Sequence, residues 1–480
     1  MQQKLTIPPK PAAPTPEIED RWRHSAKRRR MLTGNWLLDL EEELSKHLPI
    51  DRRRAWGIAD MSSNVFRSIS QALSALYDLQ PIVTVKGENA QNAAILLEKN
   101  GLIDRAGLWP LMQFVQYMTI GLNDMFIRAD IANDNLHYRP VYPDMVSAFA
   151  PAGDPLQPYY LEELRLRVID EKTVWTQDLY DLRNPKKPIY EVYVINASGE
   201  KIKNVTNQIL GGNHSGAKYP YRDASGAPYL PFVAYHAQIN GQLFSGFENR
   251  ELIAGSLSAS MLYTAFLHVT RDCSHPQRYI SGLQLAGTTI YDSDNNARRA
   301  AIATDPASIL CFVADPDTTT QPMIGQFQAG GDPLSLLEAI TIYERRLAVY
   351  AGINPADIVK SSGDPRSGFA ISLSQEAKRE AQRRYAPIFR YSDIAMLNMS
   401  AKLCNRFLGT NLPESGYNVK YQSLPLSPDE LKAQREDIAA KLDLGLIGPI
   451  EAVMQLHPDM DRVEAMAYLT QIRKERIEFS

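Results

Sequence analysis

The chain has 480 residues, of which 44% are hydrophobic and 22% are charged, and its formal net charge is −3. Both fractions are typical of globular proteins, which argues against wholesale disorder and against a collagen-like or coiled-coil chain. A chain of this length holds two to four domains or one large fold with insertions. Its near-neutral charge argues against a globally basic nucleic-acid-binding protein, while local contact with DNA, or enclosure of DNA without gripping it, stays open.

The cysteines and the N-terminus bear on the cellular compartment. Cys273, Cys311 and Cys404 are far apart and form no Cys-x-x-Cys pair. We therefore expect neither a disulfide framework nor a zinc site, and a reducing compartment. The N-terminus lacks the apolar segment of a secretory signal.

The first 30 residues fall into two parts. Residues 1–19 contain five prolines, which predicts an extended, mobile arm because proline disrupts helices and central strands. Seven basic residues without an intervening acid follow. They predict either a contact to phosphate or to an acidic partner, or the solvated start of a helix, which we favour. These residues are Arg21, Arg23, His24, Lys27, Arg28, Arg29 and Arg30.

Residues 20–130 are predicted to be mainly helical. Apolar residues at helical spacing predict a helix over Asp60–Tyr77, and a β-prone run follows at Ile82–Val85. Asn89–Lys99 is predicted to be a further helix. Leu108–Ile131 is predicted to be one long apolar helix.

Residues 137–236 predict a small antiparallel β module, either a barrel or a sandwich. In Leu164–Ile169, apolar residues alternate with Arg165 and Arg167, which is the pattern of a half-buried strand. Three further strands are expected at Thr173–Leu182, Ile189–Ile195 and Glu200–Val205.

Residues 237–272 are predicted to return to helix. Within them Leu252–Thr270 contains no Asp, Glu, Lys or Arg and is about as long as a membrane span. Its small and polar residues make it only weakly hydrophobic. We therefore expect no membrane association, but a helix packed closely against other protein.

Residues 273–333 are broken by glycine and proline. Short strands such as Ile309–Val313 and one short helix near Asn295–Ala303 are expected there. Pro333 then begins an amphipathic helix, a position where proline costs no hydrogen bond. The residues on its apolar face are Leu336, Ile340, Tyr343, Leu347 and Tyr350.

The last part of the chain alternates loops and helices. Residues 352–368 predict a flexible loop. Ala370–Leu408 is the longest predicted helix, with a kink at Pro387. Tyr417–Gln422 is a candidate strand, and residues 427–479 are predicted to be helical.

The long helix also carries a basic stripe interleaved with acids. A solvated, salt-bridged face is the favoured interpretation, and a contact with a polyanion or with a neighbouring subunit is the alternative. The basic residues are Lys378, Arg379, Arg383, Arg384 and Arg390, and the acids are Glu376, Glu380 and Asp393.

The chain lacks the sequence patterns of common catalytic sites. Gly211–Gly216 is similar to the start of a phosphate loop, but Ala217 stands where the lysine belongs. The segment from Asp292 to Ala303 lacks the glycine and the glutamate of a calcium loop. No HExxH, GxSxG or GxGxxG string occurs. We expect no catalytic, metal-ligating or cofactor-binding residue, and no enzyme.

Several strings, taken in order along nearly the whole chain, resemble the portal protein of tailed bacteriophages. The order of a helix, a clip-like broken segment, a second helix, a loop and a long helix is similar to that family. The strings are Ser68–Tyr77 with Pro81, Arg139–Asp144, Ser367–Ala370, Leu444–Pro449 and His457–Asp459.

The resemblance implies an α+β portal fold. This fold is mainly helical, with a small antiparallel β module in a wing, a clip, stem helices, a long kinked helix and a helical crown. The implied parts are a proline-rich arm (1–19), the wing (20–240), a stem helix (241–272), the clip (273–333), a second stem helix (334–351), the tunnel loop (352–368), the long helix with the wing return (369–425) and the crown (426–480).

The family also implies a function. Its members form a ring, usually of twelve subunits, at one capsid vertex, through which double-stranded DNA is packaged and ejected. The ring docks the terminase and later head–tail adaptor proteins, and it meets the major capsid and scaffolding proteins. The implied location is the virion, after assembly in the host cytoplasm. The alternatives are another ring-forming head–tail junction protein without a DNA channel, or an enzyme of the packaging system.

Two sets of site residues follow from the resemblance. The tunnel loop is expected to face DNA through Lys360, Ser361, Ser362 and Arg366. The stem helices are expected to pack between subunits through Leu257, Met261, Ala265, Ile340, Tyr343 and Leu347. A conduit must let a polyanion slide, and tight phosphate binding would stall it, so a near-neutral chain suits the task.

Overall fold

The structure is a computed structural model of the whole chain. It describes residues 15–47, 59–87, 89–210, 219–244, 250–274, 278–281, 283–285, 289–291, 297–299, 312–314, 323–326, 332–353, 368–422, 428–457, 460 and 462–478. The fold is α+β, as predicted, with many helices and small sheets in which all paired strands are antiparallel.

The first helix begins earlier than predicted. Helix α1 (Pro16–Thr33) starts at the N-cap Thr15, whose side chain accepts a hydrogen bond from the Ile18 amide, and Pro16 occupies the first turn. Proline is tolerated there, so the predicted arm is wrong over its last residues. Residues 1–14 lie outside the described part.

The basic residues of α1 are largely structural, so the prediction of a solvated helix start is wrong for them. Arg21 and Arg28 are buried. Arg21 donates to the carbonyls of Pro143 and Val146, both at 2.9 Å. Arg29 pairs with Asp144 at 2.7 Å. These contacts fasten α1 to the β module through backbone carbonyls and a carboxylate, which offset the cost of burying the guanidinium groups.

The next helices are shorter than predicted. Helix α2 (Leu37–His47) follows α1, and α4 (Val65–Leu73) begins after the N-cap Asn64. The predicted helix over Asp60–Tyr77 is therefore right only at its centre. A second predicted helix is divided into η1 (Ala90–Ala93) and α5 (Ala94–Leu97), followed by α6 (Leu102–Arg105).

The predicted long helix from Leu108 to Ile131 is wrong in its second half. Helix α7 (Leu108–Leu122) ends at Asn123, which has a φ of 72°. Strand β2 (Asp124–Ala132) follows and is the middle strand of a sheet with β3 (Asn135–Val141) and β9 (Phe232–His236). Because most of β2 is buried, its apolar run lacks the alternation that separates a strand from a helix.

A second, five-stranded sheet completes the β module. Its strands are in the order β4-β5-β6-β7-β8. Both sheets are open, which favours the sandwich over the barrel. The short helices η2 (Pro143–Met145) and α8 (Thr206–Leu210) flank this sheet. The strands are β4 (Val146–Phe149), β5 (Tyr160–Ile169), β6 (Lys172–Asp181), β7 (Ile189–Ile195) and β8 (Lys201–Asn204).

At its C-terminal half, strand β5 turns apolar side chains toward solvent and charged side chains toward the interior. Leu166 and Val168 are 45% and 72% exposed, whereas Arg165 and Arg167 lie on the inner side with the buried Glu163. The inner side also holds the buried Asp178 of β6, which pairs with Arg167. Buried carboxylates require cationic partners, and this requirement sets the orientation of the strand.

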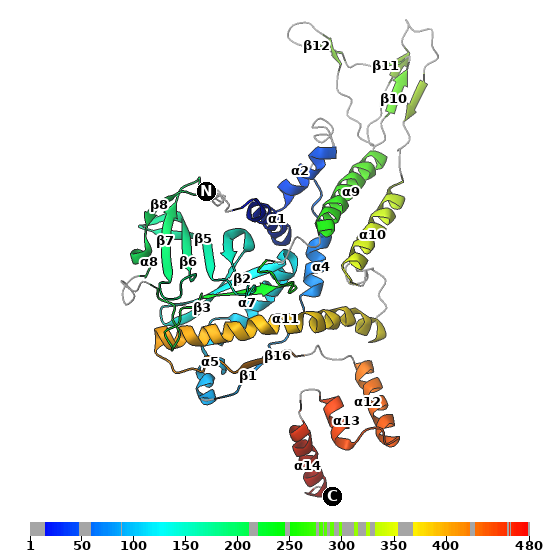
Figure 1. Cartoon of the computed structure of the whole chain (residues 1–480). Helices are drawn as coiled ribbons and strands as arrows, with labels where there is room; N and C mark the ends of the chain where they lie inside the picture. The colour runs from blue at the N-terminus through cyan, green and yellow to red at the C-terminus, as the bar shows by residue number, and fades with distance from the viewer. Residues whose placement is uncertain are drawn as a thin grey trace.

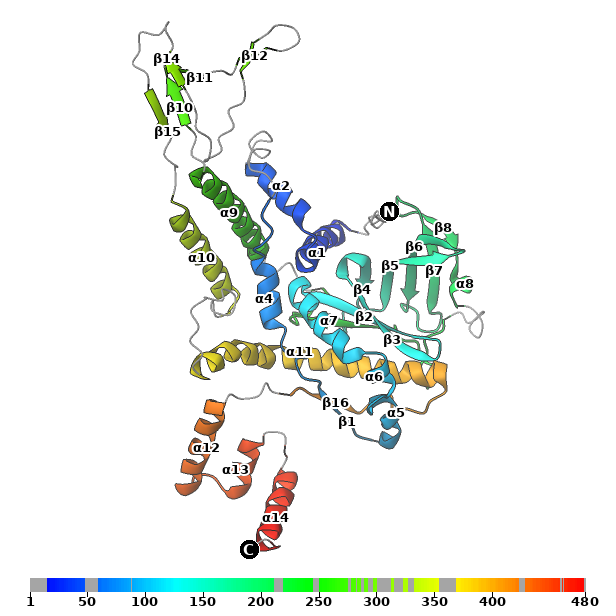
Figure 2. The ribbon, with the colours of Figure 1, turned by 180° about the vertical axis from the view of Figure 1, so that it is seen from behind.

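An antiparallel helix pair projects from this body (Figures 1 and 2). Helix α9 (Arg250–Ser274) leads away from the body, and α10 (Pro333–Tyr350) returns to it. Small two-stranded sheets lie between them at the far end, where β10 (Arg278–Ser281) pairs with β15 (Met323–Gln326).

Two predictions for this far end are tested. Strand β14 (Phe312–Ala314) pairs with β11 (Leu283–Leu285), close to the predicted strand over Ile309–Val313. The helix predicted near Asn295–Ala303 is wrong, because β13 (Ala297–Arg299) pairs there with β12 (Thr289–Tyr291).

Helix α11 (Gly368–Leu408) is the longest element and crosses beneath the body. It continues through Pro387, and its N-terminal part bends away from the line of the rest (Figures 1 and 2). Strand β16 (Tyr417–Lys420) follows and pairs with β1 (Ile82–Val85). The chain ends in α12 (Pro428–Asp443), α13 (Pro449–Leu456) and α14 (Arg462–Glu478), below α11 in Figure 1.

Candidate functional site: the projecting helix pair

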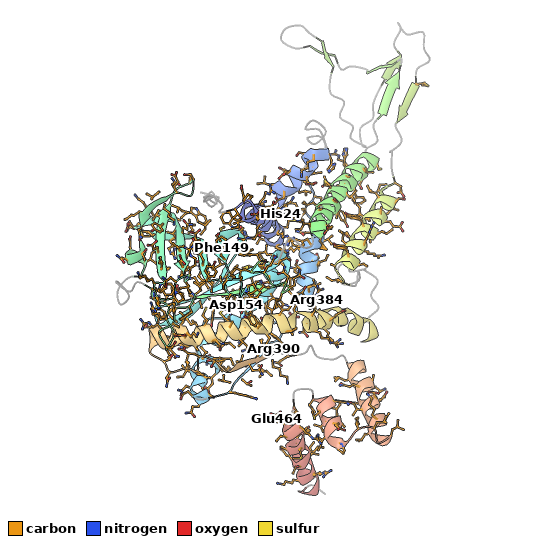
Figure 3. All side chains as sticks on the ribbon, in the orientation of Figure 1. His24, Phe149, Asp154, Arg384, Arg390 and Glu464 are labelled. Atoms are coloured by element: carbon orange, nitrogen blue, oxygen red, sulfur yellow. The ribbon has the colours of Figure 1, made fainter. Side chains whose placement is uncertain are left out.

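Helices α9 and α10 pack against each other as an antiparallel pair. The pair packs against α2 and α4, and its far end extends beyond the body (Figure 3). The four residues predicted to face DNA in the loop between α10 and α11, Lys360, Ser361, Ser362 and Arg366, lie outside the described residues.

A row of small polar residues fastens α9 to the body. Ser256, Ser260 and Thr264 repeat every four residues and therefore share one face of the helix. The Asp60 amide donates to Oγ1 of Thr264 at 2.9 Å, and Oγ of Ser260 donates to the Ser63 carbonyl at 2.6 Å. The charge-free stretch is thus hydrogen-bonded to the backbone of the segment that precedes α4.

This row bears on the membrane question. Among the described residues, Arg250–Arg271 is the one helix long and apolar enough to cross a membrane, with 44% of its most apolar window buried. Its polar row binds backbone groups of the same chain. The observation supports the prediction of a helix packed against protein.

The two helices approach closely at one glycine. A Cβ at Gly255 would lie 2.5 Å from a methyl carbon of Leu347 in α10. Only a glycine allows this separation without movement of the leucine. The close approach follows from the small-residue content of α9.

The predicted subunit-packing residues lie mainly between the two helices and the body. Leu257, Ile340 and Leu347 are buried within the single chain. Met261, Ala265 and Tyr343 are half-buried. The three buried residues are covered within the single chain, and packing between subunits through the six residues stays a prediction.

A buried carboxylate lies beside them. Glu344 accepts hydrogen bonds from the hydroxyls of Ser63 and Tyr263, the latter at 3.4 Å. Burial, together with the charge of Glu344, raises the pKa of Tyr263 to about 12. The tyrosine therefore stays a neutral donor to Glu344 across the physiological range.

The outward side of the pair carries exposed apolar side chains among charged ones such as Glu338 and Arg345. Leu334, Ile342 and Val349 of α10 are 75%, 57% and 62% exposed, and we call them the outer stripe. On α9, Leu262 and Leu267 are also exposed. The sequence prediction missed this surface, although the spacing of eight and seven residues in α10 is a helical signal for a second apolar face.

The basic stripe of α11 is only in part a solvated face. Lys378 pairs with Asp78 at 3.4 Å, and Arg384 and Arg390 are exposed on α11 (Figure 3). Arg379 and Asp393 are buried. Asp393 therefore does not belong to a salt-bridged surface, and the prediction is wrong for it.

Within the described ranges, no group of three or more His, Cys, Asp or Glu residues could hold a metal ion. The phosphate-loop-like segment Gly211–Gly216 lies outside these ranges.

Comparison with known proteins adds little. No family model matches the chain, and no curated protein matches it. Among solved structures, the chain is similar to a chain from the neck of an empty GTA particle computed with C6 symmetry. The TM-score is 0.38 at 11% identity, over 82% of this chain and 89% of that chain. A similarity of this size does not decide a function.

Proposed function

We propose that the chain is a phage portal protein, the subunit of a ring at one capsid vertex through which double-stranded DNA is packaged and ejected. In this proposal α9 and α10 are the stem, and the strands between them form the clip. The β module and α1–α7 form the wing, and α12–α14 form the crown. The proposal includes no catalytic activity.

One observation carries the proposal. The outer stripe leaves three large apolar side chains in solvent on a helix that projects from the body. Single apolar residues are ordinary on a protein surface, but three on one face of a projecting helix, interleaved with the exposed Glu338 and Arg345, suit a contact with another subunit. A ring covers such a surface on every subunit, because closed cyclic symmetry repeats one contact around the axis.

The charge of the chain supports a conduit. With a net charge of −3, the subunit has no overall attraction for DNA. Each DNA phosphate that a Lys or Arg side chain neutralises strengthens the binding of DNA and would slow its passage through the ring. We propose that Lys360, Ser361, Ser362 and Arg366 supply the limited local contact at the channel.

The partners follow from the same proposal. The ring has about twelve copies of this chain, as in the family that the sequence resembles. The clip docks the terminase during packaging and a head–tail adaptor protein afterwards. The body meets the major capsid and scaffolding proteins. The ring resides in the virion after assembly in the host cytoplasm.

The outer stripe offers a direct test by charge insertion. Leu334→Glu places a carboxylate in the proposed subunit contact, where it would lose water without gaining a partner. We expect the substitution to shift the assembly from rings to single subunits, measured by sedimentation velocity and negative-stain electron microscopy.

A matched control comes from α2. Leu38 is 74% exposed, nearly the same as Leu334, and it lies away from the outer stripe. Leu38→Glu should leave ring formation unchanged. Equal assembly of both variants with the unaltered chain would overturn the role of the outer stripe.

A further inference from the structure

A cavity of about 840 Å³ lies in the β module, away from the helix pair. It is bounded by β2, β3 and β5, by α8 and by Phe407 at the end of α11. The exposed β2–β3 turn, with Asn133 and Asp134, lies at its rim. The volume is in the range of small-molecule sites.

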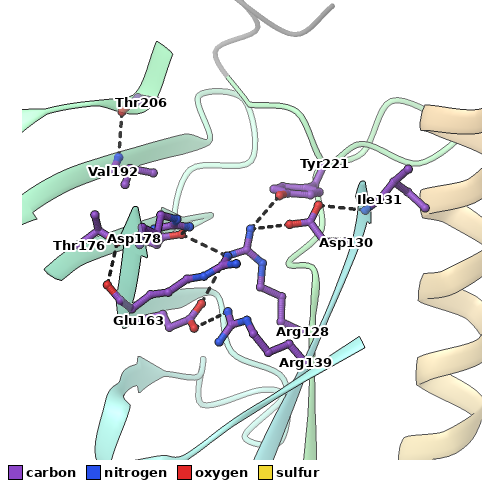
Figure 4. Close-up of polar contacts among 12 residues, drawn as sticks. Arg128, Asp130, Ile131, Arg139, Glu163, Thr176, Asp178, Val192, Thr206 and Tyr221 are labelled. Carbon is purple, nitrogen blue, oxygen red and sulfur yellow. Dashed lines mark hydrogen bonds and ion pairs between the residues drawn. The ribbon is translucent and has the colours of Figure 1, made fainter. Parts of the chain in front are cut away.

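Most charges around the cavity are already paired. Arg128 is buried and lies 2.9 Å from Asp130, 3.4 Å from Glu163 and 3.1 Å from Asp178 (Figure 4). It also donates to the hydroxyl of Tyr221 at 3.3 Å. These contacts leave Arg128 no free charge for a ligand.

The other two arginines beside these acids are paired as well. Arg139 forms an ion pair with Glu163 at 2.5 Å. Arg167 donates to Asp178, with one contact at 2.5 Å. Glu163 and Asp178 are fully buried, and each of them already has two arginine partners.

Arg165 differs from these residues. It lines the cavity and is half-buried, and its guanidinium has no hydrogen bond or ion pair to any described residue. Burial lowers the pKa of Arg165, and the positive charges of Arg167, Arg139 and Arg128 lower it further. An anion next to Arg165 would relieve both effects.

The charges around the cavity favour a singly charged anion. Arg128, Arg139 and Arg167 are paired with Asp130, Glu163 and Asp178, which leaves Arg165 as the arginine of this group without a paired carboxylate among the described residues. With Asp134 at the rim, four arginines face four carboxylates, so the cavity has no large excess of positive charge. Asp130 and Asp134 also line the cavity and would repel a doubly charged group. Residues 211–218, between Leu210 and Tyr219, contain no Asp or Glu and cannot supply the charge.

We propose that this cavity binds a ligand with a single carboxylate, held by the guanidinium of Arg165. The planar fork of arginine matches a carboxylate with two parallel hydrogen bonds. Ile131, Leu210 and Phe407 form an apolar wall for the rest of the ligand. This site does not depend on ring formation or on DNA.

Calorimetry and thermal unfolding of the full chain test the site. Sodium hexanoate serves as a free carboxylate with an apolar tail, and sodium chloride at equal ionic strength serves as the reference. We expect saturable binding of hexanoate and a rise in Tm, because the ligand binds only the folded chain. Sodium phosphate should bind more weakly.

Three variants locate the binding. Arg165→Gln should weaken hexanoate at least tenfold, while leaving the Tm of the ligand-free chain unchanged or higher. Arg165→Lys keeps the charge without the fork and should retain weaker binding. Lys203→Gln removes an exposed charge from the same sheet and should bind as the unaltered chain does.

The ligand has two possible sources. A blocked peptide with one glutamate, tested beside hexanoate, distinguishes an acidic side chain of a partner from a small organic acid, and saturable binding of either supports the site. The proposal is overturned by absence of saturable binding, by equal binding in Arg165→Gln, or by tighter binding of phosphate.

Discussion

At the scale of single residues, the most unusual group is the buried carboxyl of Asp393. It accepts hydrogen bonds from three tyrosine hydroxyls, those of Tyr77 at 2.9 Å, Tyr235 at 3.0 Å and Tyr421 at 2.6 Å. Within the described residues it has no cationic partner. Burial raises the pKa of Asp393 to about 6, although the three hydroxyls act against the shift.

The raised pKa predicts a loss of stability with rising pH. The folded chain holds the Asp393 proton up to about pH 6, whereas the unfolded chain releases it near pH 4. The folded state therefore binds more protons in this window, so the free energy of unfolding falls as pH rises through it. The shift corresponds to about 3 kcal/mol.

Asp393→Asn isolates this contribution. The amide cannot ionise, so we expect the variant to lose less stability than the unaltered chain between pH 4.5 and pH 7.5. Urea unfolding at the two pH values measures the difference. The same pH dependence in both chains would show that Asp393 is already ionised at the lower pH.

The burial of Asp393 and its tyrosine partners could not be predicted from the local sequence pattern. Asp393 lies three residues after Arg390, which is the spacing of a surface ion pair. In the structure Arg390 is exposed and Asp393 is buried. The tyrosines come from segments more than 25, 150 and 300 residues away along the chain. Nothing local in the sequence shows that they meet.

At the scale of elements, the orientation of strand β5 determines which side chains lie inside the β module. The existence of β5 and its C-terminal end were predictable from alternation, but its start at Tyr160 rather than Leu164 and its orientation were not, since either face could be inside. The deciding residues are Glu163 on β5 and Asp178 on β6, which are both fully buried. Their need for cations places Arg167 inside and leaves Val168 in solvent.

The buried ion pairs predict a large effect at Arg128. Arg128→Leu leaves Glu163 and Asp178 with one cationic partner each. Removing one partner of a buried pair costs about 3–5 kcal/mol, and we expect about 3 kcal/mol because Arg139 and Arg167 remain. Urea unfolding measures the change.

Arg183→Leu provides the control. Arg183 also pairs with an aspartate, Asp181, but its side chain is 62% exposed. Exposed pairs contribute about 1 kcal/mol or less. Similar losses in both variants would contradict the assignment of the buried pairs as the main electrostatic support of the module.

The close approach of α9 and α10 makes a second prediction at this scale. Gly255→Leu inserts a side chain where a Cβ alone would lie 2.5 Å from Leu347. Overpacking of this kind costs about 1–3 kcal/mol, and thermal unfolding should show a lower Tm. The neighbouring Ala254 is exposed, so Ala254→Leu should leave the Tm nearly unchanged. An unaltered Tm in Gly255→Leu would mean that the helices are not held this closely.

At the scale of the whole molecule, the order of the parts was predictable from the sequence. A helix with a charge-free stretch, a segment with short strands, a second helix and a long third helix appear in the structure in that order. The pairing of β1 with β16 was not predictable, although both strands were, because more than 300 residues separate them. The outer stripe was not predicted, because the sequence pattern was interpreted as a helix with a single apolar face.

The central claim is that copies of this chain close into a ring around a passage. Electron microscopy of the purified chain, with its mass measured in solution, tests the claim most directly. We expect rings of about twelve subunits with an open axial channel, in keeping with closed cyclic symmetry. A ring with a closed centre, or a chain that stays monomeric at the concentration used for imaging, would contradict it.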